Sequence, residues 1–171
     1  MIGSMAVEHR AERASLLEEL YERHAPGAVR LAFLLTSDRE LARDIAQDAF
    51  MRVAGRFRHL RYPDAFDAYL RRTVVNLCTS HFRRARLERE SLQREAAAPR
   101  RAIEPPDLGA HDELRRALQR LPIRQRTAIV LRYYEDLPEE KVATTMRCSV
   151  PAVRSLVSRG MEALRSIVRT R

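Results

Sequence analysis

The C-terminal stretch of the chain decides its fold: residues 121–169 read LPIRQRTAIVLRYYEDLPEEKVATTMRCSVPAVRSLVSRGMEALRSIVR. The pattern predicts a helix over 139–146, a tight turn over 147–149 and a second helix after the turn. Ser149 is a favourable N-cap for the second helix, and Pro151 falls in its first turn, where the missing N–H costs nothing. Two helices joined in this way predict a helix-turn-helix whose second helix lies in a groove of DNA.

The second helix of this pair has an apolar side and a polar side. Its apolar positions recur at helical spacing and are Val150, Val153, Val157, Met161, Leu164 and Val168. The opposite side carries, at i, i+1, i+4 and i+5, the residues Arg154, Ser155, Ser158 and Arg159. Arginine pairs with O6 and N7 of guanine, and serine bonds a base or a phosphate. We therefore predict that these four residues bind duplex DNA; the alternative is an exposed polar face without a partner.

The composition favours an all-helical protein and agrees with a nucleic-acid partner. The 171 residues include 32 Lys and Arg against 23 Asp and Glu, a formal net charge of +9, and glycine is scarce. Lys141 is the one lysine, and the planar fork of arginine suits phosphates and guanine edges. A basic charge balance is a weak indicator by itself, so a helical protein with a solvated basic surface stays open at this point.

The sequence gives no sign of a membrane span or a signal peptide. No apolar run approaches the roughly 20 residues that a membrane span requires. The N-terminus carries Glu8, Arg10 and Glu12 where a signal peptide has an apolar segment. We therefore expect a cytoplasmic protein without membrane insertion, in which Cys78 and Cys148 are reduced thiols.

No motif for catalysis or metal binding is visible. Neither cysteine has a second Cys or a His at metal-ligand spacing. There is no Gly-rich phosphate loop, and five histidines are scattered without acidic or Cys partners: His9, His24, His59, His81 and His111. We expect no enzyme, no metal, no cofactor and no small-molecule substrate.

The N-terminal half predicts three further helical segments. The first, opened by Leu16, Leu17 and Leu20, is interrupted or restarted at Pro26 and stops at 36–38, where Asp38 caps the next segment. The second has an apolar stripe formed by Leu41, Ile45, Ala49, Val53 and Phe57. A turn at Tyr62-Pro63-Asp64 precedes the third, whose stripe is Phe66, Leu70, Val74 and Leu77.

The third segment is strongly basic on its outer side. Its exposed positions are predicted to include Arg71, Arg72, Arg83, Arg84 and Arg86. Tyr69 and Phe82 lie among these arginines, a composition that suits single-stranded nucleic acid, because bases stack on aromatic rings while cations neutralise the phosphates. The alternative for each aromatic residue is a place in the core.

The helical pattern fails between the two halves. Residues 88–110 contain the runs Ala96-Ala97-Ala98-Pro99 and Glu104-Pro105-Pro106, which are typical of a linker. The predicted fold class is therefore all-α, with two small helical domains, residues 12–87 and 111–171, joined by a flexible linker over 88–110.

These motifs, taken in order, resemble the extracytoplasmic-function (ECF) group of the sigma-70 superfamily, over about residues 14–169. Residues 44–52 match the acidic, apolar, Gln and Phe signature of regions 2.1–2.2. Residues 69–76 resemble the region 2.3 helix, and the basic stretch to Arg86 resembles region 2.4. The opening of region 4 is matched by Leu121, Pro122, Arg126 and Tyr133.

The resemblance implies a sigma factor that directs promoter-specific transcription initiation. Region 2 would bind the clamp coiled coil of the RNA polymerase β′ subunit through Asp44, Gln47, Asp48 and Arg52. It would also recognise and melt the −10 element through Tyr69, Arg71, Arg72, Asn76, Arg83, Arg84 and Arg86. Region 4 would read the −35 element as duplex through the helix-turn-helix and contact the β flap. The resemblance further implies an anti-sigma factor as a partner.

Three departures from the family pattern bear on the details of DNA recognition. Tyr69 stands where the family usually has Trp, and Ser80 lies near a position that often holds Asp. Pro151-Ala152 replaces the usual Gly-Thr, which removes a hydroxyl and an N–H that would meet phosphate.

Two other classes of function use parts of the same pattern. A stand-alone repressor or activator would use the same helix-turn-helix as a dimer on a palindromic site, but would give residues 44–52 no purpose. A helical protein that only mimics a sigma factor would not need the arginines of the DNA faces.

Overall fold

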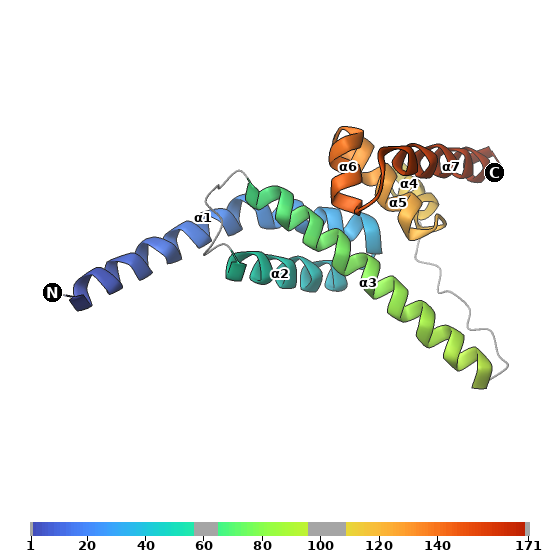
Figure 1. The fold of residues 1–171 in the computed structure, drawn as a ribbon. Coiled ribbons are helices and arrows are strands. Elements are labelled where there is room, and N and C mark those ends of the chain that lie inside the picture. The colour runs from blue at the N-terminus through green and yellow to red at the C-terminus, as the bar shows by residue number, and fades with distance from the viewer. Residues whose placement is uncertain (1, 57–64, 96–108, 170–171) are drawn as a thin grey trace.

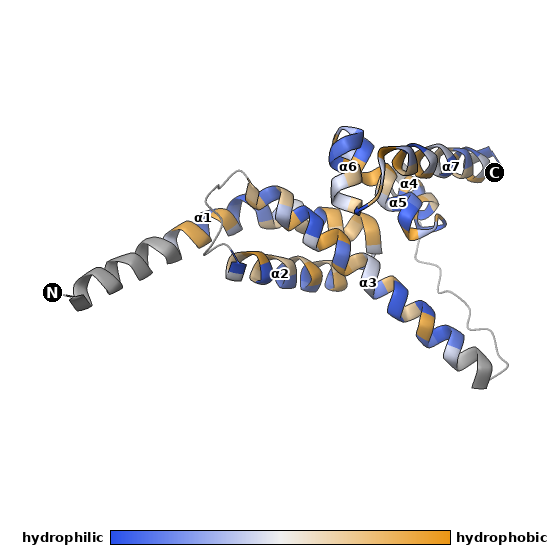
Figure 2. Cartoon of the chain, in the orientation of Figure 1, coloured by the Kyte–Doolittle hydropathy of each residue, from blue (hydrophilic) through white to orange (hydrophobic). Residues whose placement is uncertain are grey.

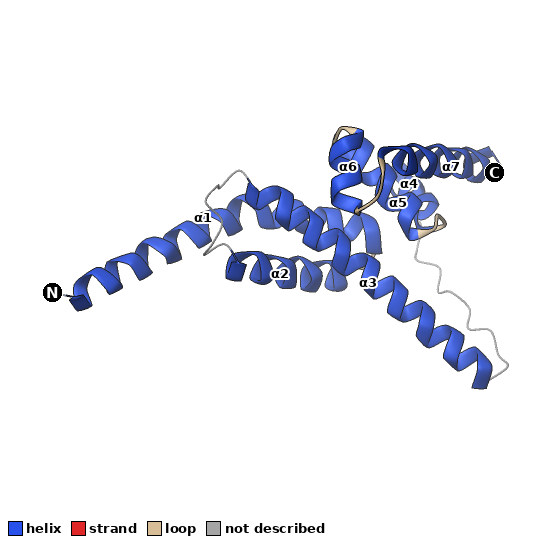
Figure 3. Cartoon of the chain, in the orientation of Figure 1, coloured by secondary structure: helices blue, strands red, loops and turns tan. Residues whose placement is uncertain are grey.

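The computed structural model describes residues 2–56, 65–95 and 109–169, and every regular element within these ranges is helical (Figures 1 and 3). The elements are α1 (Ile2–Thr36), α2 (Arg39–Arg56), α3 (Ala65–Glu95), α4 (Gly109–Gln119), α5 (Ile123–Ile129), η2 (Val130–Tyr134), α6 (Glu139–Met146) and α7 (Val150–Arg169). The prediction of an all-α fold with two helical domains is confirmed.

The N-terminal domain is a bundle of α1, α2 and α3, in which α2 lies against both other helices (Figure 1). Its largest fully buried side chains are Leu31, Leu35, Phe66, Leu70 and Val74. The chain reverses after α1 at Ser37, which has a positive φ of 58°. Asp38 then accepts a hydrogen bond from the Leu41 N–H at 3.0 Å, so the predicted stop and N-cap are confirmed.

The prediction that Pro26 interrupts the first helix was wrong, because α1 runs through it. Leu20, Ala28, Leu31 and Leu35 are buried on one face at spacings of eight, three and four residues, so the helical register is unbroken across the proline. Pro26 itself is exposed. Packing on both sides therefore outweighs the one backbone hydrogen bond that proline removes.

The third helix is longer than the sequence pattern indicated. The linker was predicted to begin at residue 88, but α3 continues to Glu95 and projects from the bundle (Figure 1). The described part of this projection is mostly hydrophilic (Figure 2). Arg86 pairs with Glu90 one turn later at 2.6 Å, an i,i+4 contact that supports an exposed helix. The rest of the predicted linker, 96–108, and the predicted turn and Phe57, within 57–64, lie outside the described residues.

The C-terminal domain contains the predicted helix-turn-helix. Helix α6 spans 139–146 as predicted, Arg147 makes the turn in the left-handed conformation (φ 51°), and Ser149 Oγ accepts the Ala152 N–H at 3.3 Å. Val153 and Leu164 of α7 are buried against the rest of the domain. The segment before α6 is α5, which begins at Ile123 and passes into the π-helical turn η2.

The two domains pack against each other around Arg126, whose residue is 4% exposed. Its guanidinium donates to the carbonyls of Leu118 (2.9 Å), Gln119 (2.9 Å) and Leu121 (3.1 Å), to Gln119 Oε1 (2.6 Å) and to the Leu35 carbonyl. The same cation lies 5.3 Å from the centre of the Phe82 ring on α3. Helix α1 ends at Thr36 and α4 at Gln119, so Arg126 caps the carbonyl ends of two helices.

The apolar core also extends across both domains. Buried side chains from both domains belong to one contiguous cluster, and α3 contacts both α5 and α6. Gln119 Nε2 adds a hydrogen bond to the Leu34 carbonyl at 3.3 Å. The carbonyl end of α1 is therefore the place where the C-terminal domain docks.

We predict that Arg126→Met lowers the free energy of unfolding by about 3 kcal/mol, because several buried carbonyls lose their donor together. Urea titration followed by circular dichroism measures the change. The matched control is Arg124→Met on the same helix, where the side chain is exposed and a change within about 0.5 kcal/mol is expected. Equal losses in both variants would contradict this role for Arg126.

A pair of glycine substitutions tests the packing of α7 on α5. A Cβ at Gly160 would lie 2.6 Å from Ile129 Cδ1 and 3.3 Å from Gln125 Cβ, whereas at Gly55 it meets nothing within 4 Å. Gly160→Ala should therefore destabilise the chain by about 1 kcal/mol, and Gly55→Ala should leave it unchanged or slightly stabilised. Thermal unfolding of both variants checks the difference, and an equal response would show that the α5–α7 contact is looser than described.

Candidate nucleic-acid interface

The polar face of α7 is presented as the sequence predicts. Its four predicted residues, Arg154, Ser155, Ser158 and Arg159, are all exposed, while Val153 on the other side is buried. Arg159 Nη2 donates to Ser155 Oγ at 2.9 Å, and Arg154 Nε pairs with Glu139 of α6 at 2.7 Å. The face thus offers two cations and two hydroxyl groups on one rigid helix, an arrangement that fits a DNA groove.

A second candidate surface is a pocket between α2 and α3. Tyr69, Thr73, Asn76 and Ser80 follow one another at i, i+4, i+7 and i+11 and line one wall. The other lining residues are Arg52, Val53, Arg56 and Leu77. The Tyr69 residue is 47% exposed, so its core alternative was wrong. An aromatic ring beside an amide, hydroxyl groups and two cations is the composition that an unstacked base and its phosphates require.

Phe82, the other aromatic residue of α3, has a different environment. It is half-buried and lies beneath the Arg126 guanidinium. Its contact is therefore internal, and the core alternative describes it better than base stacking does.

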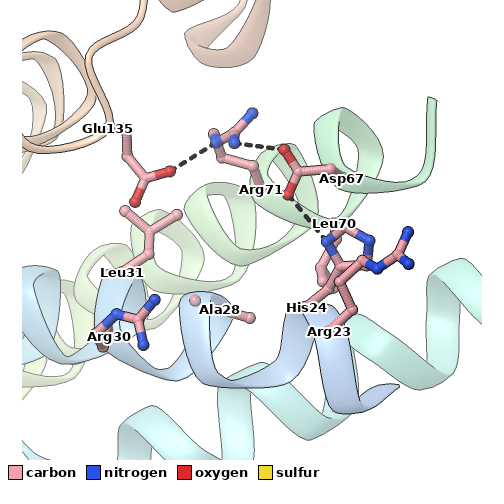
Figure 4. Close-up of a pocket in the computed structure, with 10 residues that line it drawn as sticks. Arg23, His24, Ala28, Arg30, Leu31, Asp67, Leu70, Arg71 and Glu135 are labelled. Carbon is pink, nitrogen blue, oxygen red and sulfur yellow. Dashed lines mark hydrogen bonds and ion pairs between the residues drawn. The ribbon is translucent and has the colours of Figure 1, made fainter. Parts of the chain in front are cut away.

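Arg71 and Arg72 are not on an open surface, so the expectation that both are exposed was wrong. The Arg71 side chain is 17% exposed and pairs with Asp67 Oδ2 at 2.5 Å and with Glu135 Oε2 at 2.9 Å (Figure 4). Arg72 is half-buried where α3 meets α6, and its buried Nε has no hydrogen-bond partner. The docked C-terminal domain, which the sequence pattern does not reveal, covers both side chains.

The three remaining predicted arginines are exposed but do not line the pocket. Arg83, Arg84 and Arg86 lie on the part of α3 that projects away from the bundle (Figure 1). The hydrogen bond to Glu90 raises the pKa of Arg86 above its ordinary value. These cations are placed to meet a phosphate backbone rather than a base held between α2 and α3.

The exposed face of α2 carries the residues predicted to bind polymerase. Asp44, Gln47 and Asp48 are exposed on one side of the helix. Met51 continues this face at the next turn and is 65% exposed. The sequence prediction did not include it, because that prediction was built on polar residues. Arg52 pairs with Asp48 at 2.7 Å and also lines the pocket with Tyr69 and Asn76, so it joins the two surfaces.

The buried Cys78 is not a reactive thiol. Cys78 and Cys148 are free, and burial raises the pKa of the Cys78 thiol to about 12, so Cys78 is protonated at neutral pH. Burial lowers the pKa of Arg126 to about 10, which leaves that side chain charged. Within the described ranges, no group of three or more His, Cys, Asp or Glu side chains is placed to hold a metal ion, and no helix there is long and apolar enough to cross a bilayer.

Comparison with known families divides the chain at the same place as the fold. Residues 20–88 match the family described as Sigma-70 region 2, and residues 111–164 match Sigma-70, region 4. The ECF RNA polymerase sigma factor SigM of Mycobacterium tuberculosis is 33% identical over 175 residues, covering 98% of this chain and 83% of SigM. SigE of Mycolicibacterium smegmatis is 33% identical over 158 residues, and the matched part is 86% of this chain but 60% of SigE.

Two solved structures have the same fold. The sigma factor RpoE, in complex with the anti-sigma factor NepR from Bartonella quintana, aligns with a TM-score of 0.70 over 89% of this chain and 96% of RpoE, at 23% identity. CnrH, in complex with the cytosolic domain of CnrY, aligns with a TM-score of 0.64 over 94% of both chains, at 22% identity. Because both family regions match in order, and because the match to SigM covers 98% of this chain, the chain belongs to the ECF group of the sigma-70 family of RNA polymerase sigma factors.

Proposed function

We propose that this chain binds core RNA polymerase and directs it to promoters, reading the −35 element as duplex and recognising and melting the −10 element. The family is one of non-enzymatic transcription initiation factors. The observation that supports the proposal is that one chain carries two unlike surfaces: an exposed polar helix face, which suits a groove of duplex DNA, and a pocket with an aromatic ring, which suits an unpaired base. We assign the first surface to the domain over 111–171 and the second to the domain over 12–87. The connection between them, proposed over 88–110, begins as the exposed end of α3.

The pocket between α2 and α3 would trap a base of the −10 element. Tyr69 supplies a half-exposed ring for stacking, and Asn76 supplies an amide that donates to and accepts from a base edge. Arg52 and Arg56 supply charge for the flanking phosphates. Unstacking a base costs a few kcal/mol, and stacking on an aromatic side chain recovers about 1–3 kcal/mol per base. A pocket of this kind therefore favours the melted state.

The arginines on the projecting part of α3 would bind the phosphate backbone of the DNA next to the trapped base. Arg83, Arg84 and Arg86 project beyond the pocket, so they would add affinity that depends on salt without adding base specificity. Arg71 and Arg72 join this set only when the C-terminal domain leaves them.

The recognition helix α7 would lie in the major groove of the −35 element. Arg154 and Arg159 would pair with guanine edges or phosphates, and Ser155 and Ser158 would make shorter contacts. Glu139 would give up its ion pair with Arg154 as the DNA arrives. Pro151 lacks an N–H, so the phosphate contact at the helix start would come from neighbouring groups.

Core polymerase would bind the exposed face of α2, with Asp44, Gln47 and Asp48 making polar contacts and Met51 adding an apolar contact at the next turn. The β′ clamp coiled coil is the proposed partner for this face, and the β flap is the proposed partner for region 4. An anti-sigma factor is a further proposed partner, supported by the complexes in which RpoE and CnrH were solved. The proposed site of action is the cytoplasm, where polymerase and promoter DNA are found.

Run-off transcription tests the whole proposal. Purified bacterial core polymerase, this chain and a library of genomic promoter fragments should give discrete start sites that depend on the chain. Promoter binding by the chain in the absence of polymerase, with no initiation, would favour a stand-alone regulator instead.

Two variants should separate DNA melting from polymerase binding. Asn76→Ala removes the amide from the pocket and should abolish open-complex formation while polymerase binding persists. Gln47→Ala, on the exposed face of α2, should weaken polymerase binding, so that transcription recovers at high concentrations of the variant. Gel-shift binding to core polymerase and permanganate footprinting of unpaired thymines measure the two effects. Loss of polymerase binding in Asn76→Ala would contradict the assignment of the pocket.

A third variant tests the recognition helix. Arg154→Ala should cost about 1–3 kcal/mol of discrimination between the preferred −35 sequence and a single-base change in it. The comparison variant is Arg83→Ala on α3, which should lower affinity for all sequences alike and reduce the salt dependence. Competition between the two promoter sequences in run-off assays gives the discrimination, and unchanged discrimination in Arg154→Ala would remove this residue from the reading face.

A further inference from the structure

The Arg71 guanidinium binds two carboxylates, those of Asp67 and Glu135, and so forms an anion-binding site (Figure 4). Asp67, one turn earlier on α3, belongs to the same domain, and its second oxygen lies 3.5 Å from His24 Nδ1 on α1. Glu135 comes from the other domain, 64 residues along the chain, and its Oε2 lies 2.9 Å from Arg71 Nε. Both partners of this interdomain pair are largely buried, at 17% and 18% side-chain exposure.

The backbone holds Glu135 in place at this site. Its N–H donates to the Val130 carbonyl at 3.0 Å and closes the π-helical turn η2. Asp136 then adopts a positive φ of 49°, which turns the chain toward α6. The Asp136 side chain therefore points away from Arg71 and into solvent, with 97% of it exposed.

In the docked arrangement, one part of the proposed −10 surface is open and another part is covered. The pocket with Tyr69 and Asn76 is lined only by α2 and α3, and the polar face of α7 is exposed, so both are open. Arg71 and Arg72 are covered by Glu135 and α6. Arg71 has carboxylate partners in this arrangement, whereas the buried Nε of Arg72 has no hydrogen-bond partner.

We propose that Glu135 is an internal substitute for a DNA phosphate: its carboxylate occupies the anion site of Arg71 in the free chain, and promoter DNA replaces it when the domains separate. This inference rests on the proposed function of α3 in binding the −10 region. A carboxylate and a phosphate both present two oxygens to the guanidinium fork, so the two ligands compete for one site. Any partner that separates the domains increases the affinity of α3 for DNA, and any partner that bridges them lowers it.

A matched pair of neutralising substitutions tests the competition. Glu135→Gln and Asp136→Asn change the net charge equally on adjacent residues, but only the first removes a ligand of Arg71; Asp136 lies 3.8 Å from Arg132 and makes no contact with Arg71 among the described interactions. Binding of each purified chain, without polymerase, to a fluorescent pool of short single-stranded oligonucleotides of random sequence is followed by anisotropy at several salt concentrations. Circular dichroism confirms that both variants remain folded.

Glu135→Gln should bind roughly threefold or more tightly than Asp136→Asn, with a salt dependence steeper by about 0.7, the contribution of one further phosphate contact to a single strand. In an Arg71→Ala background the Glu135→Gln gain should disappear, because the two residues act through one contact. Equal binding by the two neutralised chains, or a gain that persists without Arg71, overturns the proposal.

The run-off assay separates this failure from failure of the function. Promoter-specific initiation by the unsubstituted chain, together with equal DNA binding by the two variants, rejects the internal competitor alone. Absence of initiation rejects the proposed function and, with it, the role given to Glu135.

Discussion

The buried cation of Arg126 is the interaction on which the remaining structure depends. Helices end in carbonyl groups that have no partner within the helix, and in this chain two such ends, those of α1 and α4, meet at one guanidinium. Within the described ranges no carboxylate is among its hydrogen-bond partners, and the charge is stabilised by aligned carbonyl dipoles and by the Phe82 ring. The start of α5, where Arg126 lies, is thereby fixed against both α4 and the N-terminal domain.

This fixed point holds together a chain that carries two unlike surfaces, both proposed to bind DNA. Neither domain has a large core of its own, and their buried side chains join into one cluster. On promoter DNA the two proposed surfaces must bind two separate elements. The docked domains can do so only if the distance between their surfaces equals the distance between those elements. A covalent link raises the effective concentration of the second contact once the first has formed, so weak individual surfaces suffice when polymerase sets their spacing.

The sequence predicted the local features well and the interdomain features poorly. The N-caps Asp38 and Ser149 and the bounds of α6 depend on neighbouring residues, so their patterns could be read directly. The covering of Arg71 by Glu135 depends on two residues 64 positions apart, for which a periodicity gives no signal. Pro26 was misjudged for a related reason: a proline acts locally, whereas the burial of the residues around it is a property of the whole bundle.

The same contacts also indicate how the domains could part at low cost. Of the acceptors that surround Arg126, those of Leu118, Gln119 and Leu121 belong to its own domain, and only the Leu35 carbonyl and the Phe82 ring belong to the other. Separation therefore leaves the cation largely satisfied, and water can reach the exposed carbonyl end of α1. Arg71 loses Glu135 but keeps Asp67. Each cation therefore retains partners within its own domain when the domains separate. Docking fixes the domains relative to each other in the free chain, but it remains reversible.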